Sequence, residues 1–291
     1  MAGRISVGTS SWADPGFVEE WYPPGLAPRE RLPYYAERFA AVEVNSTFYA
    51  IPAPSSARSW AKVTPDGFTF DVKLHRLLSR HSAGPSSLPK ELRSRARTDP
   101  RGRVKLTKRL EATIADALLE GVEPLGDKLS TFLLQLTPGF GPRDHKLDEL
   151  AGLVERLSPR APVAIELRNR LWLHERRIEG TLRWFEEHGA AFVCVDAPQG
   201  SNAPTIMPPI DVTTRDDVAY LRAHGRNLDG YLRGRSVAER FGYRYGDDEL
   251  RELAGRAHEL ADHVRDVRVM FNNNRGRDAP DAAAAFEELV S

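Results

Sequence analysis

The residues best suited to chemistry stand at the ends of short apolar runs. In Val42-Glu43-Val44-Asn45, successive side chains of a β-strand point to opposite faces, so Glu43 and Asn45 share one face. The same spacing pairs Lys73 with His75, Glu166 with Arg168, and Arg222 with His224. The candidates at such ends are Glu43, Asn45, Lys73, His75, Gln135, Glu166, Arg168, Asp196, Arg222, His224, Asn272 and Asn273. Scaffolding alone rarely needs so many unlike polar groups in one place, so we expect a ligand site.

These side chains favour a phosphate-bearing or nucleic-acid ligand. Lys73, Arg168 and Arg222 can hold an anion, because lysine and arginine bind phosphate and arginine offers two parallel hydrogen bonds. The amides expected to orient the ligand are those of Asn45, Gln135, Asn272 and Asn273. For catalysis, we expect a base among Glu43, Glu166 and Asp196, with His224 as an acid or base. Such a protein could be a hydrolase or a lyase.

Metal-assisted hydrolysis of a phosphodiester is one alternative. Its divalent metal would be held by some of His75, Glu166, Asp196 and His224. No His-x-His or His-Glu-x-x-His spacing occurs, and Lys73 on the same face as His75 would oppose a cation. The sequence therefore requires no cofactor, and we assign no metal ligand.

Sugar or small-metabolite chemistry without a metal is a second alternative. Glu43 and Glu166 would form an acid and base pair, with Trp12 as part of an aromatic stacking wall. A third interpretation assigns the polar groups to a buried structural network, because charges can stay buried when they pair with one another.

The elements that must position these residues alternate between strand-type and helix-type patterns. Eight strands are predicted at residues 4–10, 41–48, 67–75, 131–137, 163–168, 191–196, 218–224 and 268–273. Helices are predicted at 31–39, 56–63, 108–120, 144–157, 177–188, 247–260 and 279–290. This alternation predicts a single (β/α)₈ barrel over residues 1–291, with an open doubly wound sheet as the alternative. A closed barrel brings all strand C-termini to one face, so we expect the candidate residues to line one connected cavity.

Two segments interrupt the regular repeat. Residues 76–109 are strongly basic, with Glu91 and Asp99 as their only carboxylates, and we expect an exposed, mobile loop at the same barrel end as Glu43 and Glu166. That loop could extend contact along a nucleic acid. Residues 198–211 are rich in proline and small polar residues, so we expect irregular structure in place of the helix after the sixth strand.

Composition sets the outer limits. The 291 residues are 41% hydrophobic and 28% charged, which is typical of a globular protein. The formal net charge is +0, so only a local surface could attract a polyanion. The single cysteine, Cys194, excludes an internal disulfide and a cysteine zinc cluster, and suits the cytoplasm. No apolar stretch approaches the roughly 20 residues that span a bilayer, so we expect no membrane partner.

Several motifs together resemble the YecE-like family, domain of unknown function 72. They include Val7-Gly8-Thr9-Ser10-Ser11-Trp12, Glu43-Val44-Asn45-Ser46-Thr47-Phe48-Tyr49, Ile165-Glu166-Leu167-Arg168, Tyr220-Leu221-Arg222-Ala223-His224-Gly225 and Phe271-Asn272-Asn273-Asn274. The resemblance covers nearly the whole chain and implies a TIM-type barrel, without an established activity. Members often end the last motif with aspartate, where this chain has Asn274, and carry a Thr-His pair that Ser79-Arg80-His81 matches only loosely.

Overall fold

A computed structural model of the chain describes residues 2–94, 96–273 and 275–291, and the eight predicted strands form a closed parallel barrel in it. The strands are β1 (Arg4–Thr9), β2 (Ala41–Val44), β3 (Thr69–Lys73), β4 (Leu129–Gln135), β5 (Val163–Glu166), β6 (Ala190–Asp196), β7 (Val218–Ala223) and β8 (Asp266–Phe271). Strand β1 pairs with both β2 and β8, which closes the sheet. The predicted (β/α)₈ barrel is therefore confirmed, and the open doubly wound sheet is wrong.

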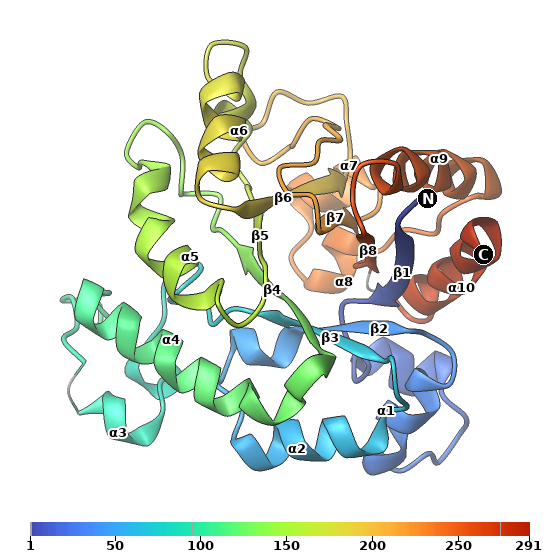
Figure 1. Cartoon of the computed structure of the whole chain (residues 1–291), viewed down its shortest axis with the longest axis horizontal. Helices are drawn as coiled ribbons and strands as arrows, with labels where there is room; N and C mark the ends of the chain where they lie inside the picture. Colours follow the sequence, from blue (N-terminus) through green and yellow to red (C-terminus); the bar gives the residue numbers. More distant parts are fainter. Residues whose placement is uncertain (1, 95, 274) are drawn as a thin grey trace.

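Helices surround the barrel (Figure 1). The longer ones are α1 (Pro28–Ala36), α2 (Pro54–Val63), α4 (Lys108–Val122), α5 (Ala151–Leu157), α6 (Ile178–Glu187), α9 (Asp247–Ala261) and α10 (Asp278–Val290). Short helical turns occur at η1 (Phe17–Trp21), η2 (Asn45–Phe48), η3 (Pro85–Ser87), η4 (Glu123–Lys128), η5 (Leu147–Leu150) and η6 (Arg170–Leu173). The helix predicted at 144–157 thus begins later, as a 3₁₀ turn that continues into α5.

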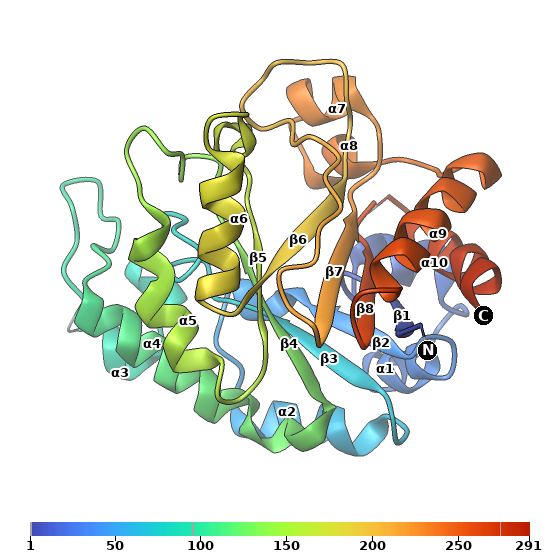
Figure 2. The same ribbon diagram turned by 45° about the horizontal axis from the view of Figure 1, so that its top comes forward.

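The connections after three strands depart from the simple repeat. As predicted, no helix lies between β6 and β7. After β3, the basic segment contains the short helix α3 (Lys90–Arg93) and an isolated bridge between Thr98 and Val104, so it is more ordered than a plain loop. After β7 come two helices that the sequence did not predict, α7 (Leu228–Arg233) and α8 (Val237–Phe241), and Figure 2 shows them together at one end of the barrel.

The two faces of each strand have different surroundings, although both are buried. On β3, Phe70 and Val72 alternate with Asp71 and Lys73, and all four side chains are at most 9% exposed. The apolar face packs against helices, as in the contact between Phe70 and Trp60 of α2. The other face fills the barrel interior, which in most such barrels holds branched apolar residues. Here it holds charged ones.

Strand β2 ends earlier than the alternating pattern predicts. Residues 45–48 form a 3₁₀ turn, in which the single hydroxyl proton of Thr47 is shared between the carbonyls of Val44 and Lys73, each 2.6 Å from Oγ1. The alternation of faces therefore stops at Val44, and it does not govern the direction of Asn45. Within the described residues, no helix is long and apolar enough to cross a membrane.

Candidate functional site

Arg222 of β7 lies at the centre of the barrel interior. Its side chain is fully buried, and its Nε and Nη2 donate to the two carboxylate oxygens of Glu43 on β2 at 2.9 and 2.8 Å. Its Nη1 donates to Glu166 of β5. One guanidinium thus joins three strands through charge-assisted hydrogen bonds, and both carboxylates of the expected acid and base pair are its acceptors.

Glu166 has hydrogen bonds at both carboxylate oxygens. Its Oε1 accepts from Gln135 Nε2 and faces His224 Nε2, each at 3.0 Å, and Arg168 Nη1 lies 3.5 Å away. Burial raises the pKa of Glu166, but Arg222, His224 and Arg168 outweigh burial and hold that pKa well below its usual value. Glu166 is therefore an ionised acceptor in a filled network, which suits it poorly to the role of a base.

His224 is held in this network as a neutral ring. Its Nδ1 lies 2.9 Å from the amide nitrogen of Asn272, which donates, so the ring proton belongs on Nε2 and points to Glu166. Burial lowers the pKa of His224, although the neighbouring Glu166 raises it. The arrangement extends the interior network from β5 to the ends of β7 and β8.

A second group of charges lies nearer the start of the strands. The Tyr220 hydroxyl is 3.1 Å from Asp71 Oδ2 and 3.3 Å from Glu43 Oε2, which links this group to Arg222. Arg268 Nη2 is 3.0 Å from Asp71 Oδ1, and both side chains are fully buried. Burial raises the pKa of Asp71 to about 6, although Arg268 lowers it. Polar contacts thus run through the barrel from Arg268 to Asn272.

Lys73, the last residue of β3, differs from the other buried ions. Its side chain is only 9% exposed, yet among the described residues its ammonium forms no ion pair and no side-chain hydrogen bond. The ammonium instead lies over the ring of Phe48, whose centroid is 4.9 Å from Nζ. The pKa of Lys73 is lowered to about 8, mainly by burial and also by Arg222, against the opposing effect of Glu43 and Glu166.

Further cationic and polar groups lie around Lys73, and we call this region the mouth; it comprises Lys73, Arg76, His81 and Arg168. The Arg76 guanidinium lies 5.7 Å from the Phe48 ring centroid, and the buried Nε2 of His81 has no hydrogen-bond partner. Burial, together with the charges of Lys73 and Arg168, lowers the pKa of His81 to about 4. The mouth therefore carries positive charge.

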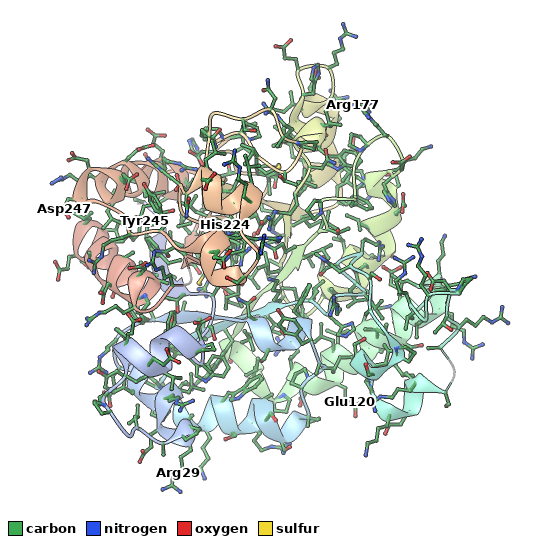
Figure 3. All side chains as sticks on the ribbon, turned by 180° about the vertical axis from the view of Figure 1, so that it is seen from behind. Arg29, Glu120, Arg177, His224, Tyr245 and Asp247 are labelled. Atoms are coloured by element: carbon green, nitrogen blue, oxygen red, sulfur yellow. The ribbon has the colours of Figure 1, made fainter. Side chains whose placement is uncertain are left out.

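Helices α7 and α8 lie over the end of the barrel where the mouth is. Arg168 Nη2 donates to the Tyr231 hydroxyl of α7 at 2.6 Å, and that hydroxyl donates to the Thr205 carbonyl at 3.2 Å. The Phe241 ring of α8 lies 5.7 Å from the ring of His224. Figure 3, seen from the side opposite to Figure 1, shows His224 beside these helices. They cover part of this end of the barrel.

Asp196 does not join the interior network. Its carboxylate accepts from Arg226 Nη2 at 2.8 Å, from Arg256 Nη1 at 3.1 Å and from the Tyr245 hydroxyl at 2.7 Å. Arg256 belongs to α9, so this end of β6 is tied to the outer helices. The expectation that Asp196 lines one cavity with Glu43 and Glu166 is not met.

His75 also does not contribute to the mouth. Its ring bonds to the Ser87 carbonyl at 3.1 Å through Nε2 and accepts from the Leu77 amide at 3.3 Å through Nδ1. Burial lowers the pKa of His75 to about 4, so the ring is neutral and both its nitrogens are used. It holds the start of the basic segment in place.

Three other candidates have structural contacts. Asn45 donates to the Ser10 carbonyl, although its own carbonyl oxygen is buried without a partner. Trp12 packs edge-on against Trp60 of α2 at 5.5 Å, rather than forming a stacking wall at the mouth. Asn273 is fully buried and donates to the Tyr243 carbonyl at 2.9 Å. Asn274 lies outside the described residues.

The donor set for a metal is not assembled. Glu166 and His224 are adjacent, but Asp196 and His75 belong to the separate contacts described above. Across residues 2–94, 96–273 and 275–291, no group of three or more His, Cys, Asp or Glu side chains could hold a metal ion. The geometry gives the metal-assisted hydrolase no support.

Three interior residues are not among the predicted candidates, although the sequence carries a signal for them. Asp71 precedes Lys73 by two positions, Tyr220 precedes Arg222 by two, and Arg268 precedes Asn272 by four. The period of two that selected the later residues also places these earlier ones on the interior face. No comparable pattern indicates Tyr231 or Phe241, because their helices were not predicted.

The fold and the interior network define an eight-stranded α/β barrel whose interior carries ion pairs and whose mouth is cationic. The chain matches the family described as protein of unknown function DUF72 over residues 6–291, and it belongs to that family. This confirms the resemblance seen in the sequence motifs.

Known relatives agree with this assignment. The chain is 30% identical to the UPF0759 protein YunF of Bacillus subtilis over 292 residues, covering 98% of this chain and 94% of that protein. It is 27% identical to the UPF0759 protein YecE of Escherichia coli over 153 residues, covering 51% of this chain and 45% of YecE. The crystal structure of a DUF72 family protein from Thermotoga maritima is similar with a TM-score of 0.74 and 27% identity, covering 99% of each chain. A DUF72 family protein from Enterococcus faecalis has a TM-score of 0.76 and 25% identity, covering 99% of this chain and 98% of that one.

Proposed function

We propose that the mouth binds a small anionic molecule through a phosphate-like group, with Lys73 as the main contact. The observation that carries this proposal is the buried Lys73 ammonium, which has no ion-pair partner in the described part of the chain. Burying a charge without a partner costs free energy, and proteins normally pair such groups. A bound anion would supply the partner.

The surrounding charges support an anion rather than a cation. Lys73, Arg168 and Arg222 face the two carboxylates Glu43 and Glu166, so this group has one positive charge in excess. Arg222 is saturated by the carboxylates, whereas Arg168 has one short bond to Tyr231 and a longer contact with Glu166. The guanidinium of Arg168 can therefore offer a further donor to a phosphate. Glu166 acts as a positioning residue for Arg168 and His224.

The position of Lys73 favours a small molecule over a nucleic acid. A side chain that is only 9% exposed can reach a terminal phosphate group more readily than a polymer backbone, and the neighbouring Arg168 is bonded to Tyr231 of α7. The basic segment 76–109 exposes several cations, but its sequence contains no Phe, Tyr or Trp on which bases could stack. Nucleic-acid binding along this segment remains the alternative. Chemistry by the pair Glu43 and Glu166 is less well supported, since Arg222 binds both carboxylates.

Sulfate binding tests the proposal and its pH dependence. Sulfate is a suitable probe because its charge is constant between about pH 6 and pH 10, so only the protein titrates. The pKa of Lys73 is about 8, so the ammonium is charged at pH 7 and mostly neutral at pH 9.5. Isothermal titration calorimetry at matched ionic strength should give an affinity at least about tenfold higher at pH 7.

Two variants make the result specific. Lys73→Met should lose most sulfate binding at pH 7, whereas Lys146→Met, which removes an exposed lysine, should bind as the wild type does. Equal loss in both variants, or binding that is unaffected by Lys73→Met, would contradict the mouth as the anion site. Binding that instead disappears when the arginines between residues 90 and 109, outside the mouth, are replaced would favour the alternative.

A further inference from the structure

We propose that the Lys73 amine is a nucleophile that forms an imine with a small aldehyde or ketone carrying a phosphate-like group. This inference rests on the proposed anion site and names the second functional group of its ligand. An amine can attack a carbonyl only when it is unprotonated and free of strong hydrogen bonds. Lys73 meets the geometric part of that requirement, because it has neither an ion-pair partner nor a side-chain hydrogen bond within the described residues.

Comparison with Lys128 shows how unusual this environment is. Lys128 Nζ donates to the carbonyls of Ala61 and Thr64 at 2.8 and 2.7 Å and lies 3.1 Å from Thr64 Oγ1. Those bonds hold the ammonium form of Lys128. Lys73 instead lies against the Phe48 ring, and burial moves its pKa to about 8, so a sizeable fraction of the amine is neutral near physiological pH.

The neighbouring cations would hold the anionic group while Lys73 reacts. A neutral amine no longer attracts the phosphate, so Arg168 and Arg76 must take that role. Arg168 is fixed by Tyr231 and Glu166, which restricts where the phosphate can sit. In this proposal the arginines of the mouth bind the phosphate, and Lys73 reacts with the carbonyl group.

The chemical step balances without an oxidant or a metal. Lys73 Nζ adds to the carbonyl carbon, a C–N bond forms, and a proton passes from nitrogen to the former carbonyl oxygen to give a carbinolamine. Loss of water then gives the imine. If cyanoborohydride is added, its hydride reduces the imine carbon and leaves a stable secondary amine on Lys73.

Reductive trapping with a matched pair of probes tests this step. The chain has seven lysines, of which Lys62, Lys90, Lys105, Lys108 and Lys146 are exposed and serve as internal references. With glycolaldehyde phosphate and cyanoborohydride, peptide mass spectrometry should show Lys73 modified at least tenfold faster than any reference lysine. With glycolaldehyde, which lacks the phosphate, this advantage should fall to about threefold or less.

Two further readings separate the possible outcomes. With cyanoborohydride in large excess, so that imine formation limits the rate, trapping at Lys73 should speed up from pH 7 to pH 8.5, the opposite of sulfate affinity, because attack needs the neutral amine and sulfate binding needs the ammonium. Arg168→Gln should slow trapping by glycolaldehyde phosphate much more than trapping by glycolaldehyde. The rate with glycolaldehyde also reports whether the mouth of the variant is still folded. If sulfate binds through Lys73 but Lys73 is trapped no faster than the exposed lysines, the imine is wrong and the anion site stands. If neither occurs, both proposals fail.

Discussion

Replacing Glu166 with glutamine is expected to lower the free energy of unfolding by about 3 to 5 kcal/mol. The carboxylate accepts from Gln135, His224 and Arg222. The NH₂ group of a glutamine is itself a donor, so it would face at least one of these donors without an acceptor between them. The change also leaves Glu43 as the only carboxylate facing Arg222 in this part of the network. For a chain of this size, the midpoint of thermal unfolding should fall by roughly 10 °C.

Asp196→Asn provides a matched control for this variant. Asp196 is also buried and bound by two arginines, but its network with Arg226 and Arg256 lies away from the mouth. Thermal unfolding and sulfate calorimetry on both variants separate stability from binding. Asp196→Asn should lose stability yet bind sulfate in the folded state, whereas Glu166→Gln should lose stability and also weaken binding through the misplaced Arg168. A Glu166→Gln variant as stable as the wild type would show that the buried network is not what holds the strands together.

Lys73→Met should stabilise the protein while removing sulfate binding. The buried ammonium is in excess over the available carboxylates, so an apolar side chain of similar length avoids a desolvation cost that no partner offsets. We expect the free energy of unfolding at pH 7 to rise by about 2 kcal/mol. If Lys73 instead stabilised the fold, Lys73→Met would lower the free energy of unfolding. Chemical denaturation of this variant distinguishes the two results.

The pH dependence of that gain follows from the pKa of Lys73, which is lower in the folded protein, at about 8, than its ordinary value of 10.5. Between these values the unfolded chain binds more protons, so the wild type gains stability as pH rises. The advantage of Lys73→Met should therefore be full below about pH 8 and vanish above about pH 10.5. Lys128→Met is the control, since it removes a lysine with three satisfied hydrogen-bonding contacts and should destabilise the protein.

The barrel could be predicted from the sequence because its elements repeat regularly. Apolar strands of four to seven residues alternate with amphipathic helices, and both faces of a parallel strand are buried whatever the ligand. The irregular segment after β6 was also visible, because proline and small polar residues cannot continue a helix. Helices α7 and α8 were not predicted, since each is only five or six residues long and carries little periodicity.

The interior network was only partly predictable for a related reason. The period of two groups Glu166 with Arg168 and Arg222 with His224, and the structure brings these four side chains together. The same period does not show which face of a strand points inward when both faces are buried. For this reason the sequence did not reveal that Asp196 lies on the outer side, where it binds Arg256.

Charge compensation is the part of the site that required three-dimensional contacts. From the sequence, Lys73, Arg168 and Arg222 are equivalent candidates for an anion contact. Only the contacts show that Arg222 is occupied by two carboxylates, whereas Lys73 has no such partner in the described part of the chain. The same contacts assign His75 to the support of a loop, although its sequence pattern matches that of His224.

If an anion completes the charge balance at Lys73, a bound anion should be found beside its ammonium in a crystal. Selenate is an analogue of sulfate whose selenium scatters anomalously, so a crystal soaked at pH 7 reveals its location without ambiguity. We expect an anomalous peak with selenate oxygens within hydrogen-bond distance of Lys73 Nζ and the Arg168 guanidinium, and no such peak in crystals of Lys73→Met. Selenate bound only along residues 90–109, with none at Lys73 in the wild type, would contradict it.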